Sequence, residues 1–571
     1  MTVTAERAVG LEVLGLMAML AVIGLLFFDQ LGHIPLFDVD EPRYAETARQ
    51  MVVNHHWITP VFNGEPRLVK PPLFYWLAAW SSMAFGVSEF SARLVSAVAA
   101  SALVFGVYAL GRAFAGSRTG ILAGLILATS LEFAALARMA ITDMTLSACI
   151  GLTMGVLFLA VHRSSRWWLA AGLIAGLGLL VKGPVAVVLP GAVALIYSVM
   201  VGRFRHTFWN AWFPLALMIS VAMAAPWFFW AAQENGPAFW QITLENNVGR
   251  FSGQAAYHPQ PWYFFVIVLA AGFLPWSVYL PVAVADRLSA FRRSGQSLRQ
   301  RIALDPLFSL TLYSGLAWLT VFAFFSASST KLLTYILPLF APLALFLACC
   351  LEARLRELGG QKPSSAAGWL ACGVLLWVGL AVAGGIAATR LGVLLPKEAA
   401  HMAGDPVNGW LAGLLLAGTA MAVWLLSQRR LFAFVLVQAL TMALVGNLAF
   451  RSVVPAVNAL TQGDMLDFVK TVRAEQLAAL PGTAPALASF HITRPSLTYY
   501  AQQNIHWIDL GERDTLAQLL QARGVVYLIT KNSFVNDLKA IVPAGSTLQT
   551  VSQRRVYHLL RLTPNRNPAN P

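Results

Sequence analysis

The sequence predicts a polytopic α-helical membrane protein of about thirteen transmembrane helices that ends in a small α/β domain. Of its 571 residues, 58% are hydrophobic and only 12% are charged, whereas soluble proteins carry about 25% charged residues. A soluble chain of this length could not hide so much apolar side chain, because much of a folded surface faces water. The composition therefore excludes a soluble enzyme, a disordered chain and a fibrous repeat.

The basic residues are interpreted as topology signals. Lys and Arg number 40 against 26 Asp and Glu, which gives a net charge of +14. These basic residues fall in short connections between apolar runs, so we expect membrane lipid, and no nucleic acid, as their surroundings. The four cysteines lie in apolar stretches without disulfide or metal-ligand spacing, so they are interpreted as small hydrophobic residues.

Thirteen apolar runs are long enough to be considered as spans, since about 20 apolar residues cross a bilayer. The first run is too long for a signal-peptide core and lacks a clear cleavage site, so we expect it to be retained. The predicted spans lie near residues 8–28, 90–111, 119–136, 143–161, 167–181, 184–201, 211–231, 262–284, 306–325, 332–351, 366–388, 409–427 and 431–449.

The basic residues also predict an orientation. If the N-terminus is cytoplasmic, every predicted inside connection carries at least two Lys or Arg residues, as the positive-inside rule requires. An odd number of spans then places the C-terminus outside.

Two long outside segments interrupt this pattern of short connections, and long connections are usually functional or independently folded. The first is a loop at 29–89, which we assign to a membrane domain of residues 1–450. The second is a polar domain at 451–571. Within it, 461–479 is typical of an amphipathic helix, and 486–490, 505–510 and 525–530 are typical of strands in an α/β domain.

Ionisable residues gather in the outside segments. Acids and bases at membrane depth are costly, so such a gathering indicates a functional site. The candidates for the site are Asp40, Arg43, Lys70, Asp143, Arg250, Lys331 and Tyr335.

Asp40 and Arg43 lie where an amphipathic helix is expected to begin at Pro42, on the outer membrane surface. Two interpretations of Asp40 stay open, because it is either a site carboxylate or only the cap of this helix. Arg43 is correspondingly either a site residue or an interfacial arginine that reaches the headgroups. Asp38 is the weaker candidate, because it lies further up the incoming loop.

Lys70 precedes Pro71 and Pro72, which predict an extended entry followed by an aromatic helix at 73–84. That geometry holds the lysine at the membrane edge. It is either an anchor or, with Arg43, Arg250 and Lys331, part of a clamp for a phosphate.

Arg250 follows Asn246 and Asn247 in a glycine-containing loop that is flexible enough to close over a substrate. His258, in the same loop, is either a ligand or structural.

Asp143 begins a predicted span. It could cap that helix, pair with Arg138 or Lys182, or serve as a second carboxylate that binds an acceptor or a metal. No His, Cys or carboxylate cluster has metal-ligand spacing. We therefore assign no metal ligands, and a divalent metal stays an open alternative.

These motifs resemble those of the GT-C membrane glycosyltransferases, and in particular the bacterial aminoarabinose (lipid A) transferases, which are relatives of the protein O-mannosyltransferases. The resemblance rests on Asp-Glu-x-Arg-Tyr-x-Glu from Asp40, on Lys-Pro-Pro-Leu-x-Tyr-Trp from Lys70, and on Asp143 at the start of a later span. It covers most of the chain.

The resemblance implies transfer of a sugar from an undecaprenyl-phosphate carrier, at the periplasmic face of the bacterial inner membrane, to lipid A, a protein or another envelope glycan. It implies that Asp40 is the main catalytic carboxylate and Asp143 a second one. It further implies that Arg43, Lys70 and Arg250 hold the carrier phosphate, with Tyr335 as a further donor.

The chain departs from the family at one position. Several aminoarabinose transferases have a glutamate, associated with bound zinc, immediately before this lysine, but here the residue is Val69. The departure puts the metal in doubt and weakens the assignment to aminoarabinose and lipid A.

Two other classes of protein are alternatives to a glycosyltransferase. A transporter or lipid flippase needs polar groups or broken helices near the bilayer midplane, and here the middles of the spans are nearly free of charge. A receptor that works through its C-terminal domain is the second alternative, and that domain carries no recognisable catalytic motif. We therefore expect a glycosyltransferase, and direct displacement with inversion at the anomeric carbon.

Overall fold

The structure is a computed structural model. It describes residues 2–253, 259–293, 297–358, 406–428, 430–480 and 483–565, with a few further residues between 371 and 383. The chain divides into two compact units. The first comprises Met1–His33, Trp57–Thr59 and Arg67–Ser452, and the second comprises Ile34–His56, Pro60–Pro66 and Val453–Pro571.

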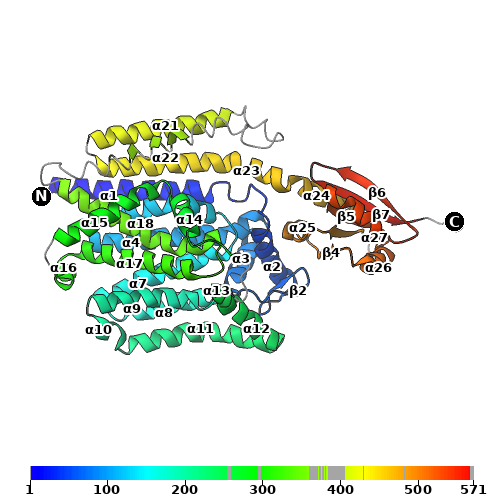
Figure 1. The fold of residues 1–571 in the computed structure, drawn as a ribbon, viewed down its shortest axis with the longest axis horizontal. Coiled ribbons are helices and arrows are strands. Elements are labelled where there is room, and N and C mark those ends of the chain that lie inside the picture. The colour runs from blue at the N-terminus through cyan, green and yellow to red at the C-terminus, as the bar shows by residue number, and fades with distance from the viewer. Residues whose placement is uncertain are drawn as a thin grey trace. The chain divides into compact units, whose positions relative to one another are not determined.

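The first unit is helical and includes the cyan and green helices of Figure 1, together with α1 and α22. Its elements are α1 (Thr2–Ile23), η1 (Gly24–Phe28), α3 (Leu73–Phe85), α4 (Glu89–Ala115), α5 (Ser117–Ala128), α6 (Leu131–Leu136), α7 (Thr142–His162), α8 (Trp167–Lys182), α9 (Val185–Met200), α10 (Phe204–Phe208), α11 (Trp212–Asn235), α12 (Pro237–Leu244), η2 (Glu245–Gly249), α13 (Arg250–Ser252), α14 (Phe264–Gly272), η3 (Trp276–Tyr279), α15 (Leu280–Arg293), α16 (Leu298–Leu304), α17 (Pro306–Ala327), η4 (Leu333–Leu339), α18 (Phe340–Leu358), α21 (Pro406–Ser427) and α22 (Leu431–Arg451).

Apolar helices of membrane-spanning length dominate this unit. Among the described residues, seven helices are long and apolar enough to cross a bilayer, or eight if one bent pair counts as a span. Five shorter apolar helices accompany them. The predicted class, a multi-pass helical membrane protein with a small C-terminal sheet domain, is confirmed, and the count of thirteen spans stays a prediction.

Two of the predicted spans are interrupted. The run at 119–136 is divided between α5 and α6, and the run at 262–284 bends by 110° between α14 and the helix that starts at Trp276. Pro275 stands at this bend, where a missing N–H cannot continue the helical hydrogen bonds. The run at 366–388 lies largely outside the described residues.

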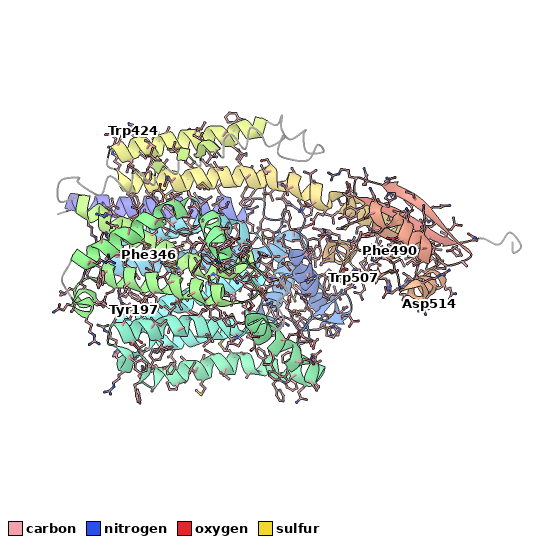
Figure 2. The ribbon with its side chains drawn as sticks, viewed as in Figure 1. Tyr197, Phe346, Trp424, Phe490, Trp507 and Asp514 are labelled. Carbon is pink, nitrogen blue, oxygen red and sulfur yellow. The ribbon has the colours of Figure 1, made fainter. Side chains whose placement is uncertain are left out.

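Small residues let neighbouring helices approach closely, as is usual in membranes. A Cβ atom on Gly172 of α8 would lie 2.5 Å from the carbonyl oxygen of Ala216 on α11. At this crossing the Ser220 hydroxyl donates to the Gly172 carbonyl over 2.8 Å. Larger side chains fill the interior elsewhere, such as Tyr197 of α9, which is labelled in Figure 2 and fully buried.

The second unit combines a segment of the first outer loop with the C-terminal domain. Its elements are α2 (Asp40–Asn54), β1 (Val61–Phe62), β2 (Glu65–Pro66), α23 (Val453–Asn458), η6 (Ala459–Gly463), α24 (Asp464–Ala478), β3 (Ala486–Phe490), α25 (Pro495–Ala501), β4 (His506–Ile508), α26 (Arg513–Arg523), β5 (Val526–Lys531), η7 (Asn532–Phe534), α27 (Val535–Ile541), β6 (Ser546–Gln553) and β7 (Tyr557–Pro564).

A five-stranded mixed sheet forms the centre of this unit, in the order β4-β3-β5-β7-β6. Strand β3 pairs in parallel with β4 and β5, whereas β7 pairs antiparallel with β5 and β6. The three strands predicted from the sequence are β3, β4 and β5. The antiparallel strands β6 and β7 were not predicted. In β6 most residues are polar, so the strand shows no clear alternation of apolar and polar side chains.

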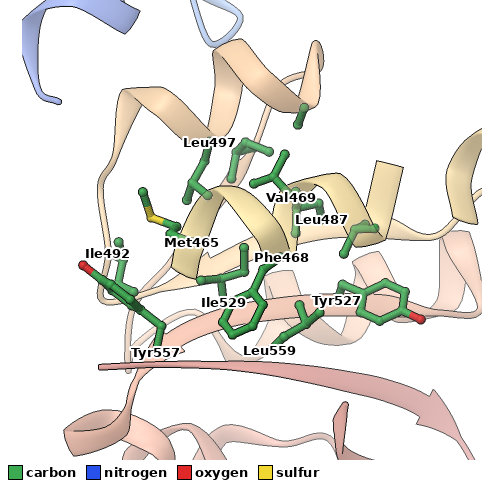
Figure 3. Close-up of a cluster of buried hydrophobic side chains, with 13 residues drawn as sticks. Met465, Phe468, Val469, Leu487, Ile492, Leu497, Tyr527, Ile529, Tyr557 and Leu559 are labelled. Carbon is green, nitrogen blue, oxygen red and sulfur yellow. The ribbon is translucent and has the colours of Figure 1, made fainter. Parts of the chain in front are cut away.

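The sheet has a hydrophobic core on each face, because alternate residues of β5 point to opposite sides. Tyr527 and Ile529 pack with Phe468 of α24 in one cluster, which Figure 3 shows. Val526 and Leu528 pack with residues of α26 and α27 in the other.

Helix α2 packs on α25 within this unit (Figure 1). It begins at Asp40, two residues before the predicted start at Pro42, and it has a protein partner where the sequence predicted the membrane surface. Asn63, in the turn between β1 and β2, adds a second connection, because its side chain bonds both the N–H and the carbonyl of Ile505. Residues 34–56 and 60–66 therefore cluster with the C-terminal domain, a division that differs from the predicted boundary at residue 450.

Candidate functional site

A polar cavity of about 110 Å³ lies in the helical unit, at the ends of several helices. It is lined by the segment before α3, the first turns of α7, the last residue of α8, η2, α13, the end of α17 and η4. The structure thus brings together three of the residues predicted from the sequence, which are Lys70, Asp143 and Tyr335.

An ion pair between Asp143 and Lys182 forms the centre of this cavity. The two residues lie 39 positions apart, and the Lys182 Nζ approaches Asp143 Oδ1 to 2.6 Å. Both side chains are largely buried, with 15% of Lys182 and 14% of Asp143 exposed. The ammonium nitrogen also lies 4.8 Å from the centre of the Tyr335 ring, a cation–π contact. Lys182 is therefore held on two sides.

Of the two partners predicted for Asp143, the structure shows Lys182 and not Arg138. Arg138 instead donates to the carbonyl oxygens of Leu26 at 3.0 Å and Asp29 at 2.7 Å, so it ties η1 and the residue that follows it to the bundle. The sequence named Lys182 as a neighbour and did not assign it to the site. A lysine at the end of an apolar helix was the signal available, since charged groups at membrane depth usually mark function.

Gly183 ends α8 directly after this lysine. Its φ of +84° lies in the region that favours glycine. A Cβ atom there would stand 3.0 Å from Oδ1 of Asn247, another lining residue. The glycine therefore lets η2 approach the end of α8 and closes one side of the cavity.

Lys70 and Lys331, two lysines predicted to belong to the site, differ in their placement. Lys70 is half-buried and lines the cavity. Lys331 is only 7% exposed and donates from Nζ to the carbonyl of Ser328 over 2.7 Å, and it is not among the described residues that line the cavity.

The loop that was predicted to close over a substrate is described in part. Arg250 begins α13, and its side chain, like the whole of His258, lies outside the described residues. The next residue, Phe251, lines the cavity and accepts a hydrogen bond from the N–H of Ser329 over 3.3 Å. This bond ties α13 to the segment between α17 and η4.

Asp40 and Arg43 belong to the second unit, where they stand on the first turns of α2. Val39 occupies the capping position, without a side-chain cap, and the carboxylate of Glu41 accepts from the Phe37 N–H over 2.8 Å. The interpretation of Asp40 as the helix cap is therefore wrong. Asp40 is exposed and Arg43 is half-buried.

Asp38 has a structural environment in the same unit. Its carboxylate accepts from the backbone N–H of Ser496 over 3.0 Å and from the Ser496 hydroxyl over 2.5 Å. Burial raises the pKa of Asp38, although these two hydrogen bonds act in the opposite direction. The C-terminal domain therefore holds the Asp38 side chain through Ser496, and this structural contact agrees with its rank as the weaker candidate.

The described residues that line the cavity do not offer the donor set of a divalent metal site. Asp143 is the one carboxylate among the described lining residues, and it is already paired with Lys182, while Val69 offers no donor. The described part of the chain contains no group of three His, Cys, Asp or Glu side chains placed to share an ion. Metal sites need several such donors converging on one point.

The cavity is suited to an anion joined to an apolar group. Two ammonium groups supply hydrogen-bond donors, and the polar lining is completed by Asn246 and Asn247, whose amide nitrogens also donate to backbone carbonyls of α12. Phe251, Phe324 and Phe325 supply an apolar wall. A phosphate carried on a lipid has this combination of properties.

The fold is that of the GT-C membrane glycosyltransferases. ArnT from Cupriavidus metallidurans superposes with a TM-score of 0.75 at 20% sequence identity in a crystal structure with undecaprenyl phosphate bound, covering 95% of this chain and 97% of that chain. Its apo structure gives the same TM-score over 97% and 98%.

Comparison of the sequence with known proteins finds a matching family model and similar enzymes. A family model described as dolichyl-phosphate-mannose-protein mannosyltransferase matches residues 69–230, which include Lys70, Asp143 and Lys182. The undecaprenyl phosphate-alpha-4-amino-4-deoxy-L-arabinose arabinosyl transferase of Pseudomonas aeruginosa (strain UCBPP-PA14) is 32% identical over 63% of each chain. The enzyme of that name from Pseudomonas paraeruginosa is 32% identical over 59% of this chain and 60% of its own. The chain thus spans about three fifths of the length of these relatives, and the resemblance predicted from its motifs is confirmed.

Proposed function

We propose that the protein is an integral-membrane glycosyltransferase that transfers aminoarabinose from undecaprenyl phosphate to lipid A at the periplasmic face. The observation that carries the proposal is the cavity in which Lys182, held by Asp143 and Tyr335, accompanies Lys70 beside an aromatic wall. The overall likeness to ArnT and the identity with the arabinosyl transferases support the donor and acceptor classes.

The proposal includes a location in the bacterial inner membrane. The N-terminus is cytoplasmic and the C-terminal domain periplasmic in this scheme. The basic residues in every predicted inside connection support this orientation.

In the proposed reaction an acceptor oxygen forms a bond to the anomeric carbon while the bond from that carbon to the carrier phosphate oxygen breaks. The phosphate leaves with the electron pair, and its growing negative charge is stabilised by the ammonium groups of Lys70 and Lys182. Such donors are effective because the fold fixes them before the reaction. Tyr335, Arg43 and Arg250 are the further proposed contacts of the carrier.

Asp143 acts in this scheme by keeping Lys182 charged and in place. Asp40 is the proposed catalytic carboxylate, which orients the acceptor and takes its proton where the acceptor is a hydroxyl. An acceptor that is itself a phosphate needs no such proton transfer, and Asp40 then only positions it. Displacement in one step inverts the configuration at the anomeric carbon.

No metal takes part in the proposed reaction, because the donor set around Val69 and Asp143 does not suit one. Incubation with EDTA is therefore expected to leave the rate of transfer unchanged.

The experiment supplies radiolabelled undecaprenyl-phosphate-aminoarabinose to membranes that contain the protein, and follows the label into lipid A, protein or other glycans. We expect the label in lipid A, and its loss in Asp40→Asn and Lys70→Ala. Lys470→Ala, a change of an exposed lysine on α24, is the matched control and should transfer normally.

Normal turnover by both site variants would overturn the assignment of the residues. Label in protein would overturn lipid A as the acceptor, and retention at the anomeric carbon would overturn direct displacement. An unlabelled product in all samples, with the protein folded, would contradict the choice of donor.

A further inference from the structure

A second cavity, of about 360 Å³, lies in the helical unit among α15, α16, α17 and α18. It contains none of the residues discussed above. Met200 at the end of α9 and Phe346 of α18 form part of its wall, and Phe346 is labelled in Figure 2. The cavity is bordered by the most basic connection of the chain, which holds five arginines between residues 287 and 301.

Most of the residues that line this cavity are apolar. Leu312, Leu316 and Leu319 line it at successive turns of α17, over a length of roughly 16 Å at 1.5 Å per residue from Phe308. Leu288 and Phe291 of α15 border it and are 55% and 40% exposed. Exposed side chains of this kind on a membrane helix face lipid, so the groove is accessible to a hydrocarbon chain.

The other end of the cavity is cationic. The Arg301 guanidinium lies over the Phe308 ring, with its carbon 4.3 Å from the ring centre. Its Nη1 is buried and has no hydrogen-bond partner among the described residues. A buried donor without an acceptor is costly, which indicates that an acceptor from outside the protein binds here. Arg287 lines the same end and donates to Asp286 over 2.5 Å.

Two carboxylates near this end do not cancel the positive charge. Asp305 lines the cavity and accepts a hydrogen bond from the N–H of Leu307 over 3.0 Å, as the cap of α17. Asp286 is shared between Arg287 and Arg354. Arg301 therefore keeps a donor for an anion at this end, and Arg287 lines the cavity beside it.

We propose that this cavity binds one anionic glycerophospholipid of the surrounding leaflet. Its phosphate accepts from Arg301 and Arg287, and one acyl chain follows α17 along Leu312 and Leu316. Basic pockets between transmembrane helices recognise anionic headgroups in this way, and guanidinium groups bind phosphate oxygens with well-defined geometry. The site is independent of the proposed sugar transfer.

Native mass spectrometry of the delipidated, detergent-purified protein tests the assignment. Phosphatidylglycerol and phosphatidylethanolamine of the same chain length are added in turn. We expect preferential retention of phosphatidylglycerol, and about tenfold weaker retention in Arg301→Gln, since a hydrogen bond to a charged group is lost.

The matched control is Arg299→Gln, because Arg299 lies on the same short helix, is exposed and does not line the cavity. It removes the same charge and should retain phosphatidylglycerol. Leu316→Trp, which fills the groove without changing a charge, should release the lipid and supports the site if Arg301→Gln fails to fold.

Equal retention of the two lipids, or equal weakening by Arg299→Gln and Arg301→Gln, would overturn the proposal. Displacement of phosphatidylglycerol by equimolar undecaprenyl phosphate would assign the cavity to the carrier instead. No turnover is measured, so failure of the transferase assignment leaves this result unchanged.

Discussion

At the scale of single residues, Lys182 is the group on which the polar cavity depends. Its ammonium has a carboxylate on one side and an aromatic ring on the other. Removal of one member of a largely buried ion pair leaves the other charge without compensation, which is more disruptive than loss of both. The two residues should therefore behave as a unit.

Asp143→Asn and Lys182→Met are each expected to reduce transfer by about 100-fold, because one fixed donor of this kind accounts for rate effects of that size. The double variant should be no worse than either single one, since the residues share one function and no unpaired charge is left. Initial rates with labelled donor, measured on protein that elutes normally from size exclusion, test this. Multiplicative losses in the double variant would show that the pair does not act together.

Asp38 should make stability depend on pH. Burial raises the pKa of this carboxyl in the folded protein, so between the unfolded pKa of about 4 and the raised folded value the folded state holds more protons. This contribution to stability is complete below the unfolded pKa and is lost as pH rises through the folded pKa.

Thermal unfolding of the second unit should show this dependence. The melting temperature of the wild type relative to Asp38→Asn should fall as pH rises from about 4 towards neutrality. Asp467→Asn, a change of an exposed carboxylate on α24, serves as the control. A relative melting temperature that rises over this range would show that the carboxyl titrates below its ordinary value.

At the scale of elements, the C-terminal domain forms hydrogen bonds with the residues that precede α2. Gln462 donates to the carbonyl of Leu36 over 2.6 Å and accepts from the N–H of Asp38 over 3.2 Å. The Tyr500 hydroxyl accepts from the N–H of Leu36 over 2.8 Å, and Ser496 holds the Asp38 carboxylate. These bonds end two residues before Asp40, so they fix where α2 starts.

Ser496→Ala and Gln462→Leu should lower kcat severalfold and leave the KM for the donor unchanged, since Asp40 is then less well positioned. Hydrogen exchange of residues 35–46 should become faster in both variants. Ser496→Thr keeps the hydroxyl and should restore both properties, and Thr461→Ala, an exposed neighbour, is the control. Faster exchange with an unchanged kcat would contradict the catalytic assignment of Asp40.

Local sequence patterns predicted many of the helices and strands. They could not predict which segments far apart in the sequence would contact one another. Pro72 predicted the start of α3, and short apolar runs between helical stretches predicted β3 and β5, which are buried almost throughout. The pairing of Asp143 with Lys182 depends on how α7 packs on α8, which periodicity does not encode. The bend between α14 and η3 was likewise hidden within one continuous apolar run.

At the scale of the whole molecule, the two compact units are interleaved in the sequence. The second unit needs residues 34–56 and 60–66 in addition to 453–571. Segment 34–56 contributes α2, in which ten residues are buried, so its absence exposes the surface of α25 that α2 covers.

A fragment of residues 453–571 is therefore expected to melt at a lower temperature than the same fragment fused through a flexible linker to residues 34–66, because each buried apolar side chain stabilises by about 1.5–3 kcal/mol. Circular dichroism of the two purified fragments measures the difference. The fusion carrying Asn63→Ala should lie between them, as it loses two hydrogen bonds to Ile505. Equal melting temperatures would show that the domain needs nothing from the first loop.

This interleaving also determines the order in which the parts of the second unit are synthesised. Residues 34–56 leave the ribosome roughly 400 residues ahead of the strands and helices they join, a wait of about 20–80 seconds at ordinary rates of translation. A nascent or prematurely terminated polypeptide that stops short of residue 453 lacks Gln462, Ser496 and Tyr500, which hold the residues before α2. We expect α2 to be less ordered in such products, however well their hydrophobic segments have inserted.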